Sequence, residues 1–289
     1  MMWWLLMACS AEFSGGPGRL DIDVQGPTTG EARTLQAFDG VRGDSNIDVY
    51  VTVAPGPVEV TAFAREGEHS SVLTVVSDGD LVMSSAPGTF VHRKVMVRMP
   101  SLQRVGQTGS ADVEVKSLEG EALVASVGGS GDLELHGAFD GLELTSTGSG
   151  DVEVASLQGP LRATLQGSGE LEVEGQITAV EVHCSGSGDV TVEGIASEQG
   201  VEASTSGSCG VDLVGKAPRA KLSVSGSGPI DGEELTVVDA VVNGSGTGDI
   251  ELRATGRVTG TLSGSGGLEL SGGAAHEVAV RGSGKVSAD

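Results

Sequence analysis

The chain has 289 residues, of which 47 are glycine, while aromatic residues make up only 3%. This composition favours a thin core of Val, Leu, Ile and Ala over a large globular core. The chain carries 40 acidic and 17 basic side chains, and the resulting net charge of −23 repels phosphate backbones and anionic lipid surfaces, so we expect no nucleic-acid partner.

The first eight residues form an apolar run that is too short to span a bilayer, which needs about 20 residues. The run ends in Leu6-Met7-Ala8-Cys9, which resembles a bacterial lipobox, where a signal is cleaved before a cysteine that then carries a lipid. A plain apolar N-terminus with a chance cysteine is the alternative, because no Lys or Arg precedes the run. We interpret residues 1–8 as a lipoprotein signal, Cys9 as the lipidated residue and residues 9–18 as a tether.

The rest of the chain, residues 19–289, reads as a single β-helix domain whose coils are less regular up to about residue 105. In this first part apolar and polar residues alternate over short runs, as in residues 46–51, 57–60, 71–75 and 95–97. Alternation of this kind predicts strands, here in coils with longer turns. The larger side chains of this part should close one end of the stack; they are Phe38, Tyr50, Phe63 and Phe90.

From residue 106 onward the chain repeats a small-residue triplet, usually Gly-Ser-Gly, ten times at a spacing of 18 to 21 residues. A period near 19 residues is the length of one solenoid coil. Glycine suits a corner where the backbone has a positive φ or lies tight against the next coil. The triplets begin at Gly109, Gly129, Gly148, Gly167, Gly186, Gly207, Gly226, Gly246, Gly264 and Gly282.

A strand pattern follows each triplet. The fourth residue after the first glycine is always aliphatic and the sixth usually is, as in Leu133 and Leu135, so both should point inward. Coils stacked about 4.8 Å apart would pair through parallel strands and share one core. The sequence therefore predicts an all-β protein, a parallel β-helix (β-solenoid) with coils of about 19 residues.

The residue between these two inward positions is usually acidic and should form an outward column, the acidic ladder: Glu114, Glu134, Glu153, Glu172, Asp212, Asp231, Glu251 and Glu269. Unit charges about 4.8 Å apart repel by about 0.9 kcal/mol even in bulk water. The favoured role of the ladder is solubility and the prevention of lateral aggregation. The alternative is weak, distributed Ca²⁺ or Mg²⁺ association along Glu114, Glu134, Glu153 and Glu172.

The other side chains show no pattern that is typical of a catalytic, cofactor or metal site. Apart from Cys9 the chain has only Cys184 and Cys209; a disulfide between adjacent coils and two unbonded cysteines both remain open. The Gly-Ser-Gly triplets lack the Gly-Lys-Ser/Thr context of a phosphate-binding loop. We predict no catalytic residue, no cofactor and no firm metal site, because the histidines show no metal-ligand spacing; they are His69, His92, His136, His183 and His276.

Several short segments, in this order, resemble the head GIN domain family, which is described as autotransporter adhesins and is found in bacterial secreted proteins and lipoproteins. They are residues 35–39, Ile47-Asp48-Val49, residues 78–83, Met99-Pro100-Ser101-Leu102 and the repeated Gly-Ser-Gly-Asp coils. The resemblance implies a right-handed parallel β-helix and a cell-envelope location, and it brings no catalytic residues. The aspartate after the triplet is replaced in some coils, where the turn chemistry should differ: at Gly210, Pro229, Gly267 and Lys285.

The expected function is that of a non-enzymatic lipoprotein that presents an elongated β-helix for adhesion to a surface ligand, a glycan or a protein. The lipobox and the family resemblance lead us to expect the cell envelope, and Ser10 after Cys9 resembles an outer-membrane rather than an inner-membrane sorting signal. A periplasmic or extracellular protein is the other possibility. A carbohydrate-active β-helix enzyme and a structural or sensory envelope module are the alternatives. An enzyme would need a cleft with acids that depart from the repeat. The shortage of aromatic residues argues against a conventional stacking site for sugars.

Overall fold

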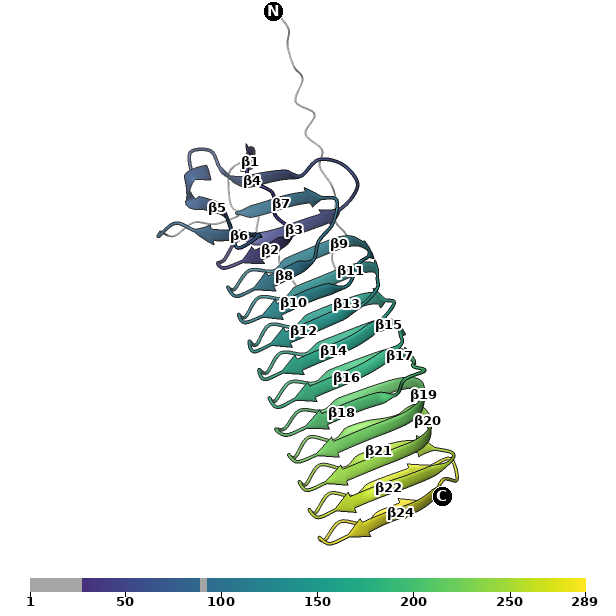
Figure 1. Ribbon diagram of the computed structural model, residues 1–289. Coiled ribbons are helices and arrows are strands. Elements are labelled where there is room, and N and C mark those ends of the chain that lie inside the picture. The colour runs from purple at the N-terminus through teal and green to yellow at the C-terminus, as the bar shows by residue number, and fades with distance from the viewer. Residues whose placement is uncertain (1–27, 89–92) are drawn as a thin grey trace, which may run out of the picture.

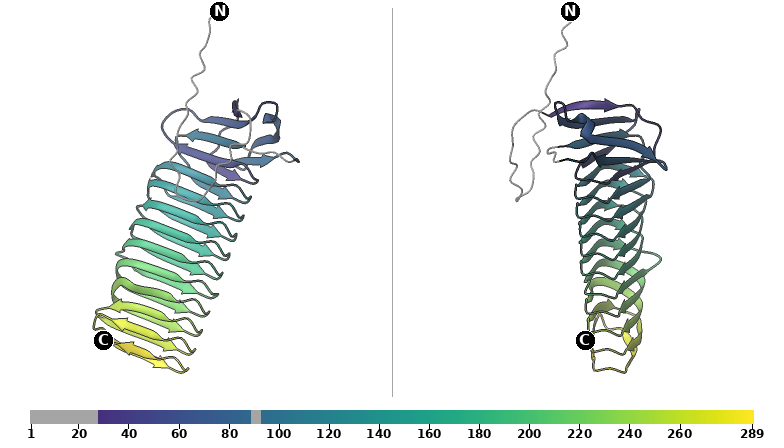
Figure 2. Two further views of the ribbon diagram at one scale, coloured as in Figure 1. Left: turned by 180° about the vertical axis from the view of Figure 1, so that it is seen from behind. Right: turned by 90° about the vertical axis from the view of Figure 1, so that its left-hand side faces the viewer.

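The computed structural model describes residues 28–88 and 93–289 (Figure 1). Their strands stack into an elongated solenoid in which each coil gives one strand to each of two facing sheets (Figure 2). This confirms the predicted β-helix. The predicted signal, the tether, Cys9, Phe90 and His92 lie outside the described residues.

Sheet 1 holds the strands that precede the triplets, in the spatial order β5 (Val72–Ser77), β6 (Asp80–Ser85), β2 (Gly40–Gly43), β8 (Arg104–Gln107), β10 (Leu123–Val127), β12 (Leu142–Ser146), β14 (Pro160–Leu165), β16 (Ala179–Cys184), β18 (Val201–Thr205), the second halves of β19 (Val211–Val224) and β20 (Ile230–Gly244), β22 (Arg257–Leu262) and β24 (Ala275–Val280).

Sheet 2 holds the strands that follow the triplets, in the order β1 (Thr28–Arg33), β4 (Glu59–Arg65), β7 (Lys94–Met99), β3 (Asp48–Val53), β9 (Val113–Gly120), β11 (Leu133–Phe139), β13 (Val152–Leu157), β15 (Leu171–Ile177), β17 (Val190–Ala196), the first halves of β19 and β20, β21 (Ile250–Ala254), β23 (Leu268–Ser271) and β25 (Val286–Ala288). A short 3₁₀ turn, η1 (His69–Ser71), lies between β4 and β5.

The core is a continuous column between the two sheets. In one coil Leu142 and Leu144 of β12 face Val152 and Val154 of β13, and all four are buried. The next coil repeats these positions in parallel register, with Leu161 beside Leu142 and Leu171 beside Val152. One coil alone could not bury these side chains, so stability depends on stacking.

The triplets require glycine because the backbones of adjacent coils approach closely at the corners, and not because the backbone has a positive φ there. A Cβ atom added at Gly148 would lie 2.0 Å from the carbonyl oxygen of Gly129, and one added at Gly150 would lie 1.9 Å from that of Gly131. The triplet glycines are absent from the positions with positive φ. The corners also pair with each other, since the N–H of Ser149 donates to the carbonyl of Gly129 at 2.9 Å.

An aspartate follows the triplet in several coils and completes the corner there, a role that the sequence alone did not reveal. Its carboxylate accepts the N–H of the equivalent residue in the following coil: Asp132 accepts from Asp151 at 2.9 Å, and Asp189 accepts from Gly210 at 3.0 Å. Where the pattern breaks, the chemistry differs as expected. Gly210 offers no carboxylate, and Pro229 above it has no N–H to satisfy.

The N-terminal part differs from the expected run of irregular coils. Parallel pairing holds for β2 and β3, but β1 pairs with β4, β4 with β7, and β5 with β6 in antiparallel fashion. The chain reverses direction here, so β4 and β5 form one backward coil over the end of the stack. Alternation of apolar and polar residues is the same in both directions, which is why the sequence pattern could not show the reversal.

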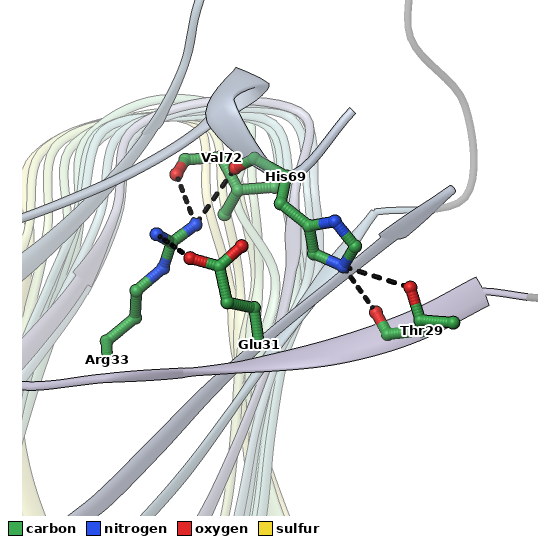
Figure 3. A network of polar contacts seen from close by, with 5 residues as sticks. All are labelled: Thr29, Glu31, Arg33, His69 and Val72. Atoms are coloured by element: carbon green, nitrogen blue, oxygen red, sulfur yellow. Dashed lines mark hydrogen bonds and ion pairs between the residues drawn. The ribbon is translucent and has the colours of Figure 1, made fainter. Parts of the chain in front are cut away.

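Polar contacts fasten this cap, defined as β1, β4, η1, β5 and β6 (Figure 3). The Arg33 guanidinium donates to the carbonyls of His69 at 2.9 Å and Val72 at 3.4 Å, and it pairs with Glu31 at 2.9 Å. The His69 Nε2 atom lies 2.7 Å from the carbonyl oxygen of Thr29. The His69 contact holds the start of β1, and the Arg33 contacts hold its end, against the segment that leads into β5.

Cys184 and Cys209 form a disulfide, which settles the question that the sequence left open. Cys184 ends β16 and points into the core, and Cys209 takes the inward third position of the next triplet. Their Cα atoms are 6.1 Å apart and both residues are buried. The bond therefore joins two adjacent coils from inside the stack.

Candidate binding surfaces

The acidic ladder lies on the outer face of sheet 2, as predicted. Glu114, Glu134, Glu153 and Glu172 are direct register neighbours on β9, β11, β13 and β15. Thr191 interrupts the column, which then continues through Asp212, Asp231, Glu251 and Glu269. The structure thus brings together the four glutamates named as a weak cation ladder, and whether they hold a cation stays a prediction.

At its upper end the ladder already has positive neighbours. Lys116 pairs with Glu114 at 2.7 Å, and His136 lies 3.4 Å from Glu134. Possible ligand atoms of Glu114, Glu134 and His136 all lie within 4.8 Å of one another. Ligand spacing along the chain does not indicate His136, because this set forms between residues of two adjacent coils.

Further along, the carboxylates crowd one another. Burial raises the pKa of Asp212, and the charges of Asp231, Glu234 and Glu193 raise it further. Burial likewise raises the pKa of Glu251, with Asp231 and Glu269 adding to the shift. This half of the ladder is a source of repulsion in the folded molecule.

Two of the shallow grooves among the described residues lie on the strand faces of the coils. One, of about 270 Å³, lies on sheet 2 between the ladder and the turn carboxylates, and it is lined by Asp132, Glu134, Asp151, Glu153, Glu170 and Glu172 among others. The other, of about 480 Å³, lies on sheet 1, where Arg162 pairs with Glu181 at 2.7 Å and Lys221 with Glu202 at 2.6 Å. The acids of both grooves occupy repeating positions of the coil, a pattern expected of a binding surface or of a structural module, whereas an enzyme would need acids that depart from the repeat.

The aromatic residues of the N-terminal part do not all close the stack as predicted. Phe38 packs against the core, but Tyr50 points outward on β3 and is 37% exposed. The Lys94 ammonium lies 5.7 Å from the ring centre of Tyr50 and 5.5 Å from that of Phe63, with Met96 exposed alongside on β7. Strands β3, β4 and β7 thus carry a small exposed aromatic surface at the N-terminal end of the acidic ladder.

The remaining described histidines have ordinary polar surroundings. The His183 Nδ1 atom lies 2.6 Å from the Ser204 hydroxyl, and its Nε2 atom lies 3.3 Å from Glu181. His69 belongs to the cap contacts, and His276 is exposed on β24. Within the described ranges, no helix has the length and apolar character to cross a membrane.

These features define a capped, two-sheet β-solenoid whose candidate binding surfaces are the exposed outer faces of the two sheets. The family model described as "Putative auto-transporter adhesin, head GIN domain" matches residues 37–193 and 162–274. The chain belongs to this family. The two matched stretches overlap, as expected when a repeat can be aligned in more than one place.

Solved structures show the same fold. The chain is similar to a "putative adhesin" from Parabacteroides distasonis, with 19% identity and a TM-score of 0.52 over 91% of this chain and 98% of the other. It is also similar to a "putative adhesin" from Parabacteroides merdae, with 19% identity and a TM-score of 0.50 over 91% and 97% of the two chains. No curated protein matches the sequence.

Proposed function

We propose that this protein is a cell-envelope lipoprotein, anchored through Cys9 to the outer membrane, that presents its β-helix for adhesion to a glycan or protein on another surface. The observation that carries the proposal is membership of an adhesin family over most of a solenoid with regular, open outer faces. Coils spaced about 4.8 Å apart give such a molecule a long contact surface from a thin core.

The disulfide supports an envelope location. Structural disulfides persist in oxidising compartments such as the periplasm and the cell surface, and they are rare in the cytosol. The bond between Cys184 and Cys209 lies inside the coils, so it serves the fold. A structural disulfide of this kind would be unusual in a cytosolic protein.

The anchor is tested by a Cys9→Ala substitution followed by membrane fractionation. The wild-type chain should sediment with the outer membrane, and the variant should move to the soluble fraction. A Ser14→Ala substitution is the matched control, because it changes a residue of the same N-terminal segment without touching the proposed lipid site. A soluble wild-type chain would refute the anchor but leave the binding role open.

The binding role is tested with residues 19–289 on glycan arrays and on cell surfaces. Saturable binding that is reduced by charge reversal in one groove, such as Arg162→Glu, would support adhesion. The enzyme alternative predicts release of sugar fragments from a bound polysaccharide. The acids that line the two grooves described above follow the repeat of the coils, whereas the enzyme alternative requires acids that depart from it, so we do not propose it.

A further inference from the structure

Two histidines of the stack follow a glutamate by two residues on the same strand. Glu134 and His136 lie on β11 of sheet 2, and Glu181 and His183 lie on β16 of sheet 1. Residues two apart in a strand point to the same face of the sheet, so each pair offers a carboxylate and an imidazole side by side. Both groups are common ligands of zinc and similar divalent metal ions in proteins.

The pair on β11 gains a third ligand from the neighbouring coil, because Glu114 of β9 is the direct register neighbour of Glu134. Ligand atoms of Glu114, Glu134 and His136 lie within 4.8 Å of one another, the one such group among residues 28–88 and 93–289. We call it the β9–β11 cluster. The His136 Nε2 atom lies 3.4 Å from the Glu134 carboxylate. Two ligand atoms at about 2.1 Å from a tetrahedral zinc ion are about 3.4 Å apart, so this pair already has the required spacing.

The surroundings of the β9–β11 cluster favour a cation. All three side chains are partly exposed, so an ion can reach them from solvent. The register neighbour of His136 on β13 is Ala155, whose short side chain leaves space beside the imidazole. The register neighbour of Glu134 on the same strand is Glu153, which adds a further negative charge. A run of like charges of this kind raises the local concentration of cations.

One basic side chain competes for the cluster. The Lys116 ammonium lies 2.7 Å from the Glu114 carboxylate, and its side chain is 38% exposed. Exposed ion pairs of this kind contribute little to stability, because water and salt screen them. An ammonium only donates hydrogen bonds to one carboxylate, whereas a divalent metal ion bonds directly to all three ligands of the cluster. A bound metal ion should therefore displace Lys116 from Glu114.

The pair on β16 provides an internal comparison. His183 lies 3.3 Å from Glu181, a spacing close to that on β11, but Glu181 also pairs with Arg162 at 2.7 Å. The register neighbour that corresponds to the third ligand is Glu202, and it pairs with Lys221 at 2.6 Å. Both carboxylates beside this imidazole therefore have a basic partner. In the β9–β11 cluster only one of the two has such a partner among the described lysines and arginines.

We propose that Glu114, Glu134 and His136 bind one zinc ion or a similar first-row transition-metal ion. The ion takes a carboxylate oxygen from each glutamate and a ring nitrogen from His136, and water completes its coordination shell. The site joins β9 to β11 on the outer face of sheet 2. It differs from the weak Ca²⁺ or Mg²⁺ association considered for the ladder, because those ions prefer oxygen ligands alone. It does not depend on the lipid anchor or on adhesion.

Zinc binding tests the site in the full chain with Cys9→Ser, which removes the one cysteine outside the disulfide. Competition with a chromophoric chelator at neutral pH measures the affinity for Zn²⁺. His136→Gln should weaken binding about tenfold or more, because it removes a ligand. His183→Gln is the matched control: it removes an imidazole that also lies beside a glutamate, and it should leave the affinity unchanged. Equal affinities of the parent chain and His136→Gln, or equal losses in both variants, would overturn the proposal.

A second variant should change the affinity in the opposite direction. Lys116→Gln should tighten Zn²⁺ binding about twofold to fivefold, because it removes the competing ammonium. Lys216→Gln, at an exposed position of β19, makes the same change in net charge and should have no effect. Weaker or unchanged binding by Lys116→Gln would contradict the site.

Thermal melts supply a readout that depends on the fold. Zn²⁺ should raise the melting temperature of the parent chain but not that of His136→Gln, because a ligand that binds only the folded state stabilises it. Melts without metal check that the variants fold equally well. An equal rise with Ca²⁺ in place of Zn²⁺ would refute a transition-metal site and leave only the general attraction of the ladder for cations.

Discussion

Single residues at the triplet corners are set by how closely one coil approaches the next. At Gly129 an added Cβ would lie 1.9 Å from the carbonyl oxygen of Gly109. At Gly128, one position earlier, the nearest atom to an added Cβ is the Thr108 Cγ2 atom at 3.7 Å. Of these two adjacent glycines, only Gly129 is required by the close stacking of the coils.

Gly129→Ala should lower the free energy of unfolding by about 3 kcal/mol or more, because backbone atoms must shift to remove the clash. Gly128→Ala should change it by about 0.5 kcal/mol or less, since its Cβ meets only ordinary contacts and the site is exposed. Urea unfolding followed by circular dichroism measures both. Similar losses in the two variants would contradict the close-approach explanation.

The disulfide between Cys184 and Cys209 should contribute measurably to stability. Replacing Cys184 and Cys209 together with alanine should lower the free energy of unfolding by about 2–5 kcal/mol, because the bond restricts the unfolded chain. Wild-type protein unfolded with dithiothreitol should show the same loss. The reductant should have no effect on the double variant, and any effect there would point to a cause other than this bond.

At the scale of elements, the strands of sheet 2 carry repulsion that depends on pH. The pKa values of Asp212 and Glu251 are raised above their ordinary values of 3.8 and 4.5. The folded chain therefore binds these protons more tightly than the unfolded chain does. Their contribution to stability is fully present below the ordinary values and is lost as the pH rises through the raised ones.

Asp212→Asn and Glu251→Gln should therefore raise the melting temperature at pH 7 and have little effect at about pH 3, where the carboxyls are protonated anyway. Thermal melts at both pH values measure the difference. Glu143→Gln, at an exposed position of sheet 1, is the control and should give a smaller shift. A loss of stability at pH 7 would mean that these carboxylates make favourable contacts.

In the whole molecule a first part with nearly balanced charge is followed by a strongly acidic stack of regular coils. Residues 28–105 hold nine acidic and seven basic side chains, whereas residues 106–289 hold 28 and nine. The ladder spreads part of this charge along one face. Such a stack resists lateral association with copies of itself, in keeping with the favoured role of the ladder.

Cation association would involve the ladder as a unit and not a single carboxylate. If Ca²⁺ associates along Glu114, Glu134, Glu153 and Glu172, the melting temperature should be higher with Ca²⁺ than with EDTA, and Glu134→Gln should reduce the difference. Thermal melts at constant ionic strength measure it. Identical midpoints would leave solubility as the role of the ladder.

Much of the stack was predictable because each coil repeats the same pattern of glycine, apolar and acidic residues. The inward pair Leu133 and Leu135, the outward Glu134 and the corner glycines each recur at a fixed place in the period, so one pattern read ten times predicted a parallel β-helix. The ladder glutamates were placed correctly for the same reason. The role of the aspartate after the triplet was missed, because its partner is an N–H in the next coil.

The sequence by itself determined the period, the inward and outward faces and the family resemblance, since these depend on local alternation and spacing. Only the tertiary structure decided the direction of β4 and β5, the bond between Cys184 and Cys209 and the approach of His136 to Glu114. Each of these joins residues from different turns of the chain, and alternation is the same for a strand that runs forward or back. Contacts between coils therefore had to come from the folded molecule.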